Sequence, residues 1–81
     1  MAWINLKTTL IEAEHLADGV KTFVFRNKNI HVGVGDVVTF TAYKNKQPTR
    51  HRIENMKFDV VYISTEAPID KDFKVIGVRK K

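Results

Sequence analysis

Cysteine is absent from this chain of 81 residues, so neither a disulfide nor a thiolate metal site can support the fold. A chain without cysteine suits a reducing compartment, and we expect a cytoplasmic protein. The sequence also lacks a long apolar run, and its first residues carry no basic segment followed by an apolar one. We therefore expect neither a membrane span nor a signal peptide.

Residues that commonly carry catalysis or bind metals are few and scattered. The three histidines, His15, His31 and His51, lie far apart, and none has a carboxylate at the spacing of a metal site. Ser64 is the only serine and belongs to no nucleophile motif. The glycine pair within residues 33–35 lacks the third glycine and the following helix of a dinucleotide site, so a turn explains it better. We expect no metal and no cofactor.

Positive charge is in excess and unevenly distributed. The chain has 14 lysines and arginines against 9 acidic residues, a formal net charge of +5. Residues 1–20 carry −2, residues 21–60 carry +5 and residues 61–81 carry +2. A localised positive field attracts polyanions, which favours nucleic-acid binding. A soluble surface with a moderate charge imbalance explains the same numbers.

The hydrophobic pattern predicts a strand, a helix and then four strands in one domain spanning residues 1–81. The first strand is expected at residues 3–7. Thr9 can cap the following helix, and Glu12, three residues later, completes a capping box. Glu12 and the other acidic residues of the helix are expected to face water. Gly19 supplies the left-handed residue that ends a helix.

Four strands are predicted after the helix, at residues 21–26, 37–43, 50–63 and 73–78. A polar hairpin loop at residues 44–48 joins the second and third of them. The strand at 50–63 is long enough to need a bend or bulge, for which Asn55 is the expected place. Residues 79–81 are expected to form a flexible basic tail.

One helix against a curled, mostly antiparallel sheet is the economical arrangement of these elements. The predicted fold class is α+β, mainly β: a small β-barrel of about five strands, with the helix between the first two. A closed barrel would also remove exposed sheet edges. A domain of this size has a thin core, so most aromatic side chains are expected inside it: Trp3, Phe23, Phe25, Phe40, Phe58 and Phe73.

Several short motifs follow one another in a distinctive order and spacing. They are Leu6-Lys7, the segment Gly19-Val20-Lys21-Thr22-Phe23-Val24-Phe25-Arg26, Val34-Gly35-Asp36, Val60-Val61-Tyr62-Ile63 and a closing apolar strand. Together they resemble the ASCH branch of the PUA-like superfamily, small β-barrel domains linked to RNA, and within it a short bacterial and phage branch. The resemblance covers nearly the whole chain. It departs at Val24, where the family has glutamate, and at Asn29-Ile30, which replaces an acidic–basic pair.

Lys21 and Arg26 stand at the two ends of a predicted strand. The resemblance implies that both face a groove between helix and barrel, where a nucleotide is expected. Arginine offers a planar fork of donors and lysine a compact charge. Their spacing is odd, so a regular strand places them on opposite faces, and they converge only if Lys21 lies outside the strand. The alternative is that both are solvated cations at strand ends.

The densest basic cluster of the sequence consists of Lys44, Lys46, Arg50, His51 and Arg52. On a hairpin these cations could hold a phosphate backbone, with Tyr43 available to stack on a base. The alternative is a charged hairpin that protects a sheet edge. The nucleic-acid contacts are accordingly predicted at Lys21, Arg26, Tyr43, Lys44, Lys46, Arg50 and Arg52.

Three functions remain open. The expected one is non-catalytic binding of RNA or another nucleic acid. We expect no membrane partner. The second follows from the resemblance, because some ASCH-like proteins hydrolyse acetylated cytidine with a lysine, a nearby threonine and a carboxylate. Lys21 would match that lysine, but the threonine position is Val24, and no motif places Glu54 or Glu66 as the carboxylate. The third function is a protein-interaction module that inhibits a host factor.

Overall fold

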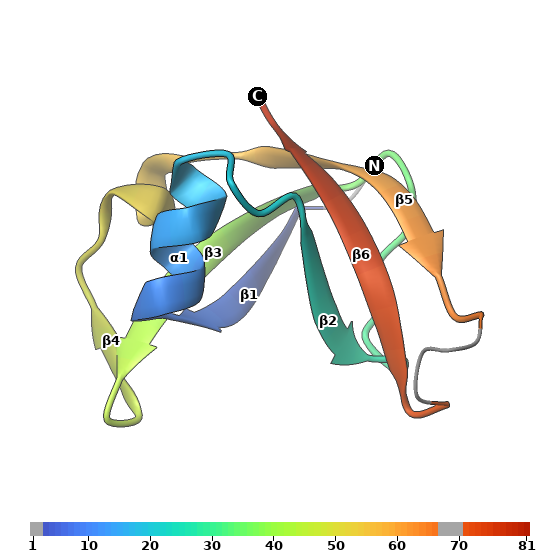
Figure 1. Cartoon of the computed structure of the whole chain (residues 1–81), viewed down its shortest axis with the longest axis horizontal. Helices are drawn as coiled ribbons and strands as arrows, with labels where there is room; N and C mark the ends of the chain where they lie inside the picture. Colours follow the sequence, from blue (N-terminus) through green and yellow to red (C-terminus); the bar gives the residue numbers. More distant parts are fainter. Residues whose placement is uncertain (1–2, 67–70) are drawn as a thin grey trace.

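The computed structural model describes residues 3–66 and 71–81 of the chain (Figure 1). Its elements are β1 (Trp3–Thr9), α1 (Leu10–Ala17), β2 (Phe23–Asn27), β3 (Val37–Lys44), β4 (Gln47–Thr49), the 3₁₀-helix η1 (Arg52–Asn55), β5 (Phe58–Ser64) and β6 (Phe73–Lys80). The strands form one mixed sheet in the order β1-β3-β5-β6-β2, with β4 paired to β3. β1 and β3 run parallel and the other pairs antiparallel. The prediction of a mainly β fold with a helix between the first two strands is confirmed.

The helix begins and ends where the sequence predicts. Thr9 caps it, its hydroxyl accepting the backbone N–H of Glu12 at 3.1 Å, and Gly19 follows the C-terminal end with a φ of +77°. The amides of Val20 and Lys21 both donate to the carbonyl of His15, at 3.0 and 3.1 Å. These bonds hold Lys21 at the end of the helix, so β2 begins at Phe23 and the predicted start of that strand at residue 21 is wrong.

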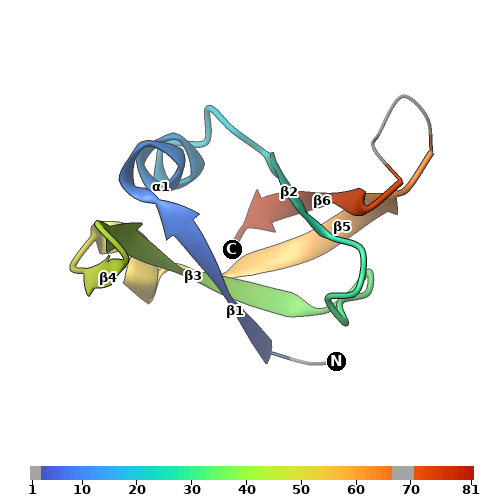
Figure 2. The same cartoon turned by 90° about the horizontal axis from the view of Figure 1, so that it is seen from below.

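The core lies between α1 and the inner face of the sheet. Alternation along each strand sends one row of side chains inward, and the buried apolar residues form one cluster. At its centre the rings of Phe40 and Phe58 meet edge to face, with centroids 5.3 Å apart. Seen from below, α1, β4 and η1 gather at one end of the molecule, while β5 ends and β6 begins at the other (Figure 2). The first of these ends carries the candidate site.

Four of the six aromatic residues predicted inside the core are exposed instead. Trp3 is 62% exposed, Phe73 44%, and Phe23 and Phe25 42% and 49%. The alternation of β2 was assigned correctly, but its inward row is the one that contains Val24, which is fully buried. Aliphatic side chains surround Phe40 and Phe58 in this thin core, and the aromatic row of β2 points outward.

The predicted long strand at residues 50–63 is wrong because a 3₁₀-helix interrupts it. His51 precedes η1, and its Nδ1 accepts the N–H of Ile53, whose side chain is fully buried. The chain therefore turns inward before β5 starts. The bulge lies between Val60 and Tyr62 rather than at Asn55, and it sends Tyr62 to the outer face.

The predicted hairpin loop and flexible tail are both more ordered than expected. The loop shrinks to two residues, because Lys44 pairs directly with Gln47 and residues 47–49 form β4. At the C-terminus, β6 continues to Lys80, which pairs with Phe58 and donates from Nζ to the carbonyl of Ala17 at 3.2 Å. The prediction of a flexible tail over residues 79–81 is therefore wrong.

Candidate nucleic-acid interface

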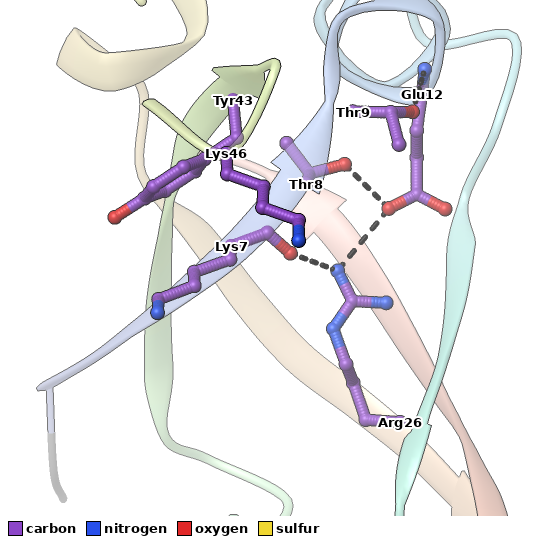
Figure 3. A pocket seen from close by; sticks show the side chains of 7 residues that line it. All are labelled: Lys7, Thr8, Thr9, Glu12, Arg26, Tyr43 and Lys46. Atoms are coloured by element: carbon purple, nitrogen blue, oxygen red, sulfur yellow. Dashed lines mark hydrogen bonds and ion pairs between the residues drawn. The ribbon is translucent and has the colours of Figure 1, made fainter. Parts of the chain in front are cut away.

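A pocket of about 510 Å³ opens at the end of the molecule formed by the N-terminus of α1 and the β3–β4 hairpin (Figure 3). It is lined by Lys7, Thr8, Thr9, Glu12, Arg26, Tyr43 and Lys46. Three cationic side chains thus face one carboxylate. The elements that meet here are β1, the first turn of α1, β2 and the hairpin.

The parallel pairing of β1 with β3 positions one wall of the pocket. Thr9 lies opposite Tyr43 and Lys7 opposite Thr41 in the register, so Lys7 and Tyr43 share one face of neighbouring strands. The Nζ atom of Lys7 lies 5.3 Å from the centroid of the Tyr43 ring. A half-buried aromatic ring with an ammonium group beside it offers a stacking surface and a positive charge in one place.

Lys46 reaches the pocket from the tip of the hairpin. Asn45 and Lys46 form its two-residue turn, with φ of +53° and +65°. Turns with two positive φ values match the twist of a hairpin and usually carry glycine at the second position. The β3–β4 turn thus holds a lysine where glycine would cost less strain.

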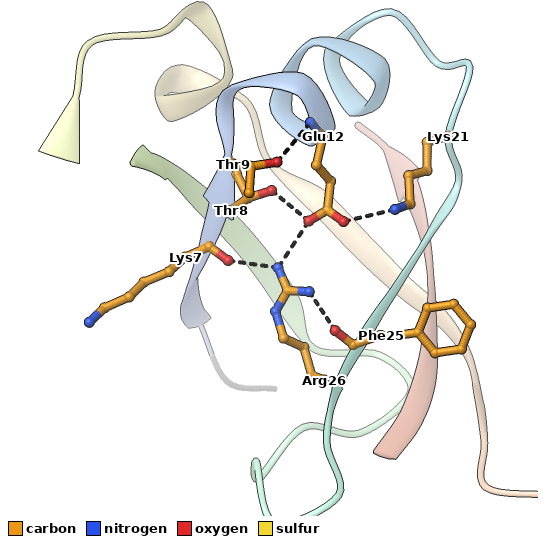
Figure 4. Close-up of polar contacts among 7 residues, drawn as sticks. All are labelled: Lys7, Thr8, Thr9, Glu12, Lys21, Phe25 and Arg26. Carbon is orange, nitrogen blue, oxygen red and sulfur yellow. Dashed lines mark hydrogen bonds and ion pairs between the residues drawn. The ribbon is translucent and has the colours of Figure 1, made fainter. Parts of the chain in front are cut away.

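Glu12 is the centre of a hydrogen-bonded cluster (Figure 4). Its Oε2 accepts from Nζ of Lys21 at 2.8 Å, while its Oε1 accepts from the hydroxyl of Thr8 at 2.5 Å and from the guanidinium of Arg26 at 3.2 Å. Burial alone would raise the pKa of Glu12, but the hydrogen bonds from Lys21, Thr8 and Arg26 outweigh it and lower the pKa below its ordinary value. The prediction that Glu12 faces water is therefore wrong, and the carboxylate is ionised at neutral pH.

Arg26 joins the two edge strands of the sheet. Besides Glu12, its guanidinium donates to the carbonyl of Phe25 on its own strand at 2.5 Å and to the carbonyl of Lys7 on β1 at 2.7 Å. The side chain is only 17% exposed. Most of its donors are therefore already used within the protein.

The predicted site residues separate into three groups. Arg26, Tyr43 and Lys46 line the pocket, and Lys21 contacts it through Glu12. Lys21 and Arg26 converge because Lys21 lies outside the regular strand, the one condition under which their odd spacing permits it. A further pair, Lys44 and Arg50, is exposed, does not line the pocket and makes no ion pair within the described part of the chain.

Arg52 belongs to a different surface. Its guanidinium pairs with Glu14, at 2.6 Å, and with Asp18, so it ties η1 to α1. His51 approaches the same Glu14 carboxylate at 2.9 Å. Hydrogen bonds from Arg52 and then His51 lower the pKa of Glu14. The basic cluster of the sequence is therefore divided, and its C-terminal part is balanced by the acidic helix.

Four pocket residues were not predicted as site residues: Lys7, Thr8, Thr9 and Glu12. Lys7 appears in the Leu6-Lys7 motif, but only the parallel pairing of β1 with β3 brings it beside Tyr43. Thr8, at the end of β1, is buried on the inner face, and its hydroxyl donates to the carboxylate of Glu12 in the first turn of α1. Glu12 was predicted only as a capping residue. Its spacing of four residues from Thr8 was the available signal that its carboxylate also bonds to that hydroxyl.

The comparison with known protein families identifies the family of the chain. The model for "Domain of unknown function (DUF3850)" matches residues 4–78, so the chain belongs to this family. No curated protein matches the sequence. Within residues 3–66 and 71–81, no helix is long and apolar enough to cross a membrane, and no group of three His, Cys, Asp or Glu side chains could hold a metal ion.

Proposed function

We propose that this domain binds nucleic acid without catalysis, with RNA as the expected ligand, and that it is an ASCH-type barrel of the PUA-like superfamily. The observation that carries the proposal is the pocket in which Lys7, Lys46 and Tyr43 face one another beside Arg26. Cations that neutralise phosphates and an aromatic ring that stacks on a base are the two components of single-strand binding.

The position of Lys46 supports a functional role for the hairpin. A non-glycine residue at positive φ costs free energy of folding, and such strain is concentrated at functional sites. Lys46 carries its charge over the pocket, and the neighbouring Lys44 and Arg50 are exposed and without ion pairs among the described residues. An unpaired cation can neutralise a phosphate without first breaking an internal contact.

The bridge made by Arg26 supports the barrel. The sheet order leaves β1 and β2 at its two edges. Exposed edges invite pairing with other chains, and closure removes them. Because Arg26 binds carbonyls of both edge strands, it brings the edges together at the pocket.

Titration of labelled single- and double-stranded RNA and DNA at two salt concentrations tests the function. We expect the wild type to bind single-stranded RNA with an affinity that falls steeply with salt. Each of the variants Lys7→Gln, Lys44→Gln, Lys46→Gln and Arg50→Gln removes one cation that faces a phosphate, and each should reduce the salt slope by about one unit. Lys71→Gln, an exposed lysine at the opposite end of the molecule, is the matched control. A variant that combines all four substitutions should lose most of its affinity. If its RNA affinity and salt slope equal those of the wild type, the proposed interface is refuted.

A second candidate, hydrolysis of an acetylated nucleoside, is favoured by one observation. Lys21, Thr8 and Glu12 form a connected lysine–threonine–carboxylate network beside the pocket. These are the residue types that the acetylcytidine hydrolases among ASCH-like proteins use, although the threonine and the carboxylate come from other positions. Incubation of the purified protein with acetylated cytidine tests it: unchanged substrate at high protein concentration excludes the activity, and turnover that Lys21→Ala abolishes supports it.

A further inference from the structure

Four exposed aromatic side chains gather on the outer face of β2, β6 and β5, on the far side of the sheet from the core. This aromatic face consists of Phe23, Phe25, Tyr62 and Phe73, which are 42%, 49%, 55% and 44% exposed. The three strands are neighbours in the sheet (Figure 1). A small domain that leaves four large rings in water on one surface is expected to use that surface.

Strand register explains how these rings share one face. Phe23 lies opposite Gly77, and Gly77 lies opposite Tyr62 on the next strand. Gly77 leaves room between the two rings, because a Cβ at this position would lie 3.0 Å from Cβ of Tyr62. Phe25 and Phe23 stand edge to face, with centroids 5.8 Å apart. The rings therefore lie on one face across the three strands.

The aromatic face lies on the opposite side of β2 from the pocket, and Lys21 lies between the two surfaces. Arg26 points into the pocket, whereas the preceding ring, Phe25, points away from it on the other side of the strand (Figure 4). Lys21 touches both surfaces, since its Nζ pairs with Glu12 and lies 5.6 Å from the centroid of the Phe23 ring. A chain bound in the pocket could thus pass over β2 and reach the rings.

Lysines accompany exposed rings throughout this protein. Nζ of Lys57 lies 4.6 Å from the ring of Trp3, and the pairs Lys7–Tyr43 and Lys21–Phe23 follow at 5.3 and 5.6 Å. An ammonium group within about 6 Å of a ring centroid is attracted to the face of the ring. Lysine is depleted from the cores of protein–protein interfaces, whereas rings beside cations are the composition of surfaces that bind single-stranded nucleic acids.

We propose that the aromatic face is a stacking platform for the bases of a single-stranded RNA whose phosphates are held at the pocket. This inference rests on the proposed function and adds the mode of recognition. Arg79, on the same face of β6 as Gly77, supplies a further exposed cation beside the rings. Because every base has a π-face, stacking here implies weak sequence preference and a strong preference for single strands.

Two oligomers of equal length separate stacking from phosphate binding: a single-stranded RNA of mixed sequence and an abasic oligomer with the same backbone. We expect the wild type to bind the RNA at least about tenfold more tightly than the abasic oligomer, since one stacked base contributes about 1–3 kcal/mol. The double variant Phe25→Ala, Tyr62→Ala should lose most of this preference and keep the salt slope. Ile11→Ala, which shortens an exposed apolar side chain on α1, is the matched control, and circular dichroism confirms that each variant folds.

The outcomes distinguish the two proposals. A preference for RNA over the abasic oligomer that the aromatic substitutions leave unchanged would overturn the platform and leave the pocket, with Tyr43 as its stacking ring, intact. Equal affinity of the wild type for both oligomers would overturn the platform and the stacking on Tyr43, and would leave only the phosphate contacts. Failure to bind either oligomer would overturn both. A wild-type protein that forms a dimer in solution, with the aromatic double variant monomeric and RNA affinity unchanged, would show that a second copy covers this face and would also overturn the platform.

Discussion

The guanidinium of Arg26 donates to the carbonyl oxygen of Lys7, 19 residues away in sequence, at a distance of 2.7 Å. This bond links β2 to β1, the strands at the two edges of the sheet. The same guanidinium contacts Phe25 and Glu12. Arg26 therefore holds the site together, and in the proposed function it sets the width and charge of the pocket rather than extending toward a ligand.

Replacement of Arg26 should destabilise the fold. Arg26→Ala removes one donor from each of two carbonyls and from the partly buried carboxylate of Glu12, which keeps those of Thr8 and Lys21, and this should lower the free energy of unfolding by about 1–3 kcal/mol. Arg26→Lys keeps the charge but cannot bind several acceptors through one planar group, so it should restore only part of the loss. Urea unfolding measures both. An effect no larger than that of Arg50→Ala, an exposed arginine without an ion pair among the described residues, would contradict this role.

Acid should weaken the fold through Glu12. Its pKa is lowered in the folded state, so the folded protein binds the proton less readily than the unfolded chain. The stabilisation is fully present above the ordinary glutamate pKa of about 4.3 and is lost as the pH falls through the lower folded-state value.

The variant Glu12→Gln should be less stable than the wild type at neutral pH, and the difference should shrink in acid. Thermal unfolding across this pH range measures it. Glu54→Gln, which changes an exposed carboxylate without an ion pair in the described part of the chain, is the control. A constant difference between Glu12→Gln and the wild type at all pH values would exclude the electrostatic explanation.

Lys46→Gly should separate stability from binding. Glycine adopts a positive φ without strain, and this gain exceeds the entropy that glycine loses on folding. We therefore expect an increase of up to about 1 kcal/mol in the free energy of unfolding. The same change removes a cation from the pocket and should weaken RNA binding and its salt dependence. If RNA affinity stays unchanged while stability rises, Lys46 has no part in binding.

Arg50 and Arg52 should differ in their effect on RNA binding although they are two residues apart. Arg52 is held by Glu14 and Asp18, whereas Arg50 makes no ion pair among the described residues. Arg50→Gln should therefore reduce the salt slope by about one unit, and Arg52→Gln should leave it close to the wild-type value. A slope reduced equally in both variants would show that the Glu14–Arg52 contact opens on binding, and a slope unchanged in both would remove Arg50 from the interface.

A methyl group at residue 77 should disturb the outer face of the sheet. The Cβ of Gly77→Ala would lie 3.0 Å from Cβ of Tyr62, closer than ordinary packing allows. We expect a loss of about 1 kcal/mol or more in the free energy of unfolding, as is typical of overpacking. Gly33→Ala is the control, because its Cβ would meet only Oδ2 of Asp36 at 3.8 Å. Equal stability of the two variants would show that β5 shifts at no cost.

The helix ends and the alternation of β2 can be recognised from neighbouring residues alone. Thr9 and Gly19 bound the helix because a hydroxyl cap and a left-handed residue act within a few positions. The alternation along β2 likewise separates Val24 from Phe23 and Phe25. These signals depend on neighbours in the chain, so they can be recognised without the fold.

The choice of the buried face and the pairing of distant charges depend on the assembled fold. Alternation does not say which row is buried, and the shared core cluster takes in Val24 rather than the phenylalanines. Glu12, Lys21 and Arg26 converge because the chain returns past the first turn of the helix, and Arg52 meets Glu14 because η1 packs beside α1. Contacts between residues distant in sequence depend on how the sheet bends, and no local pattern encodes that.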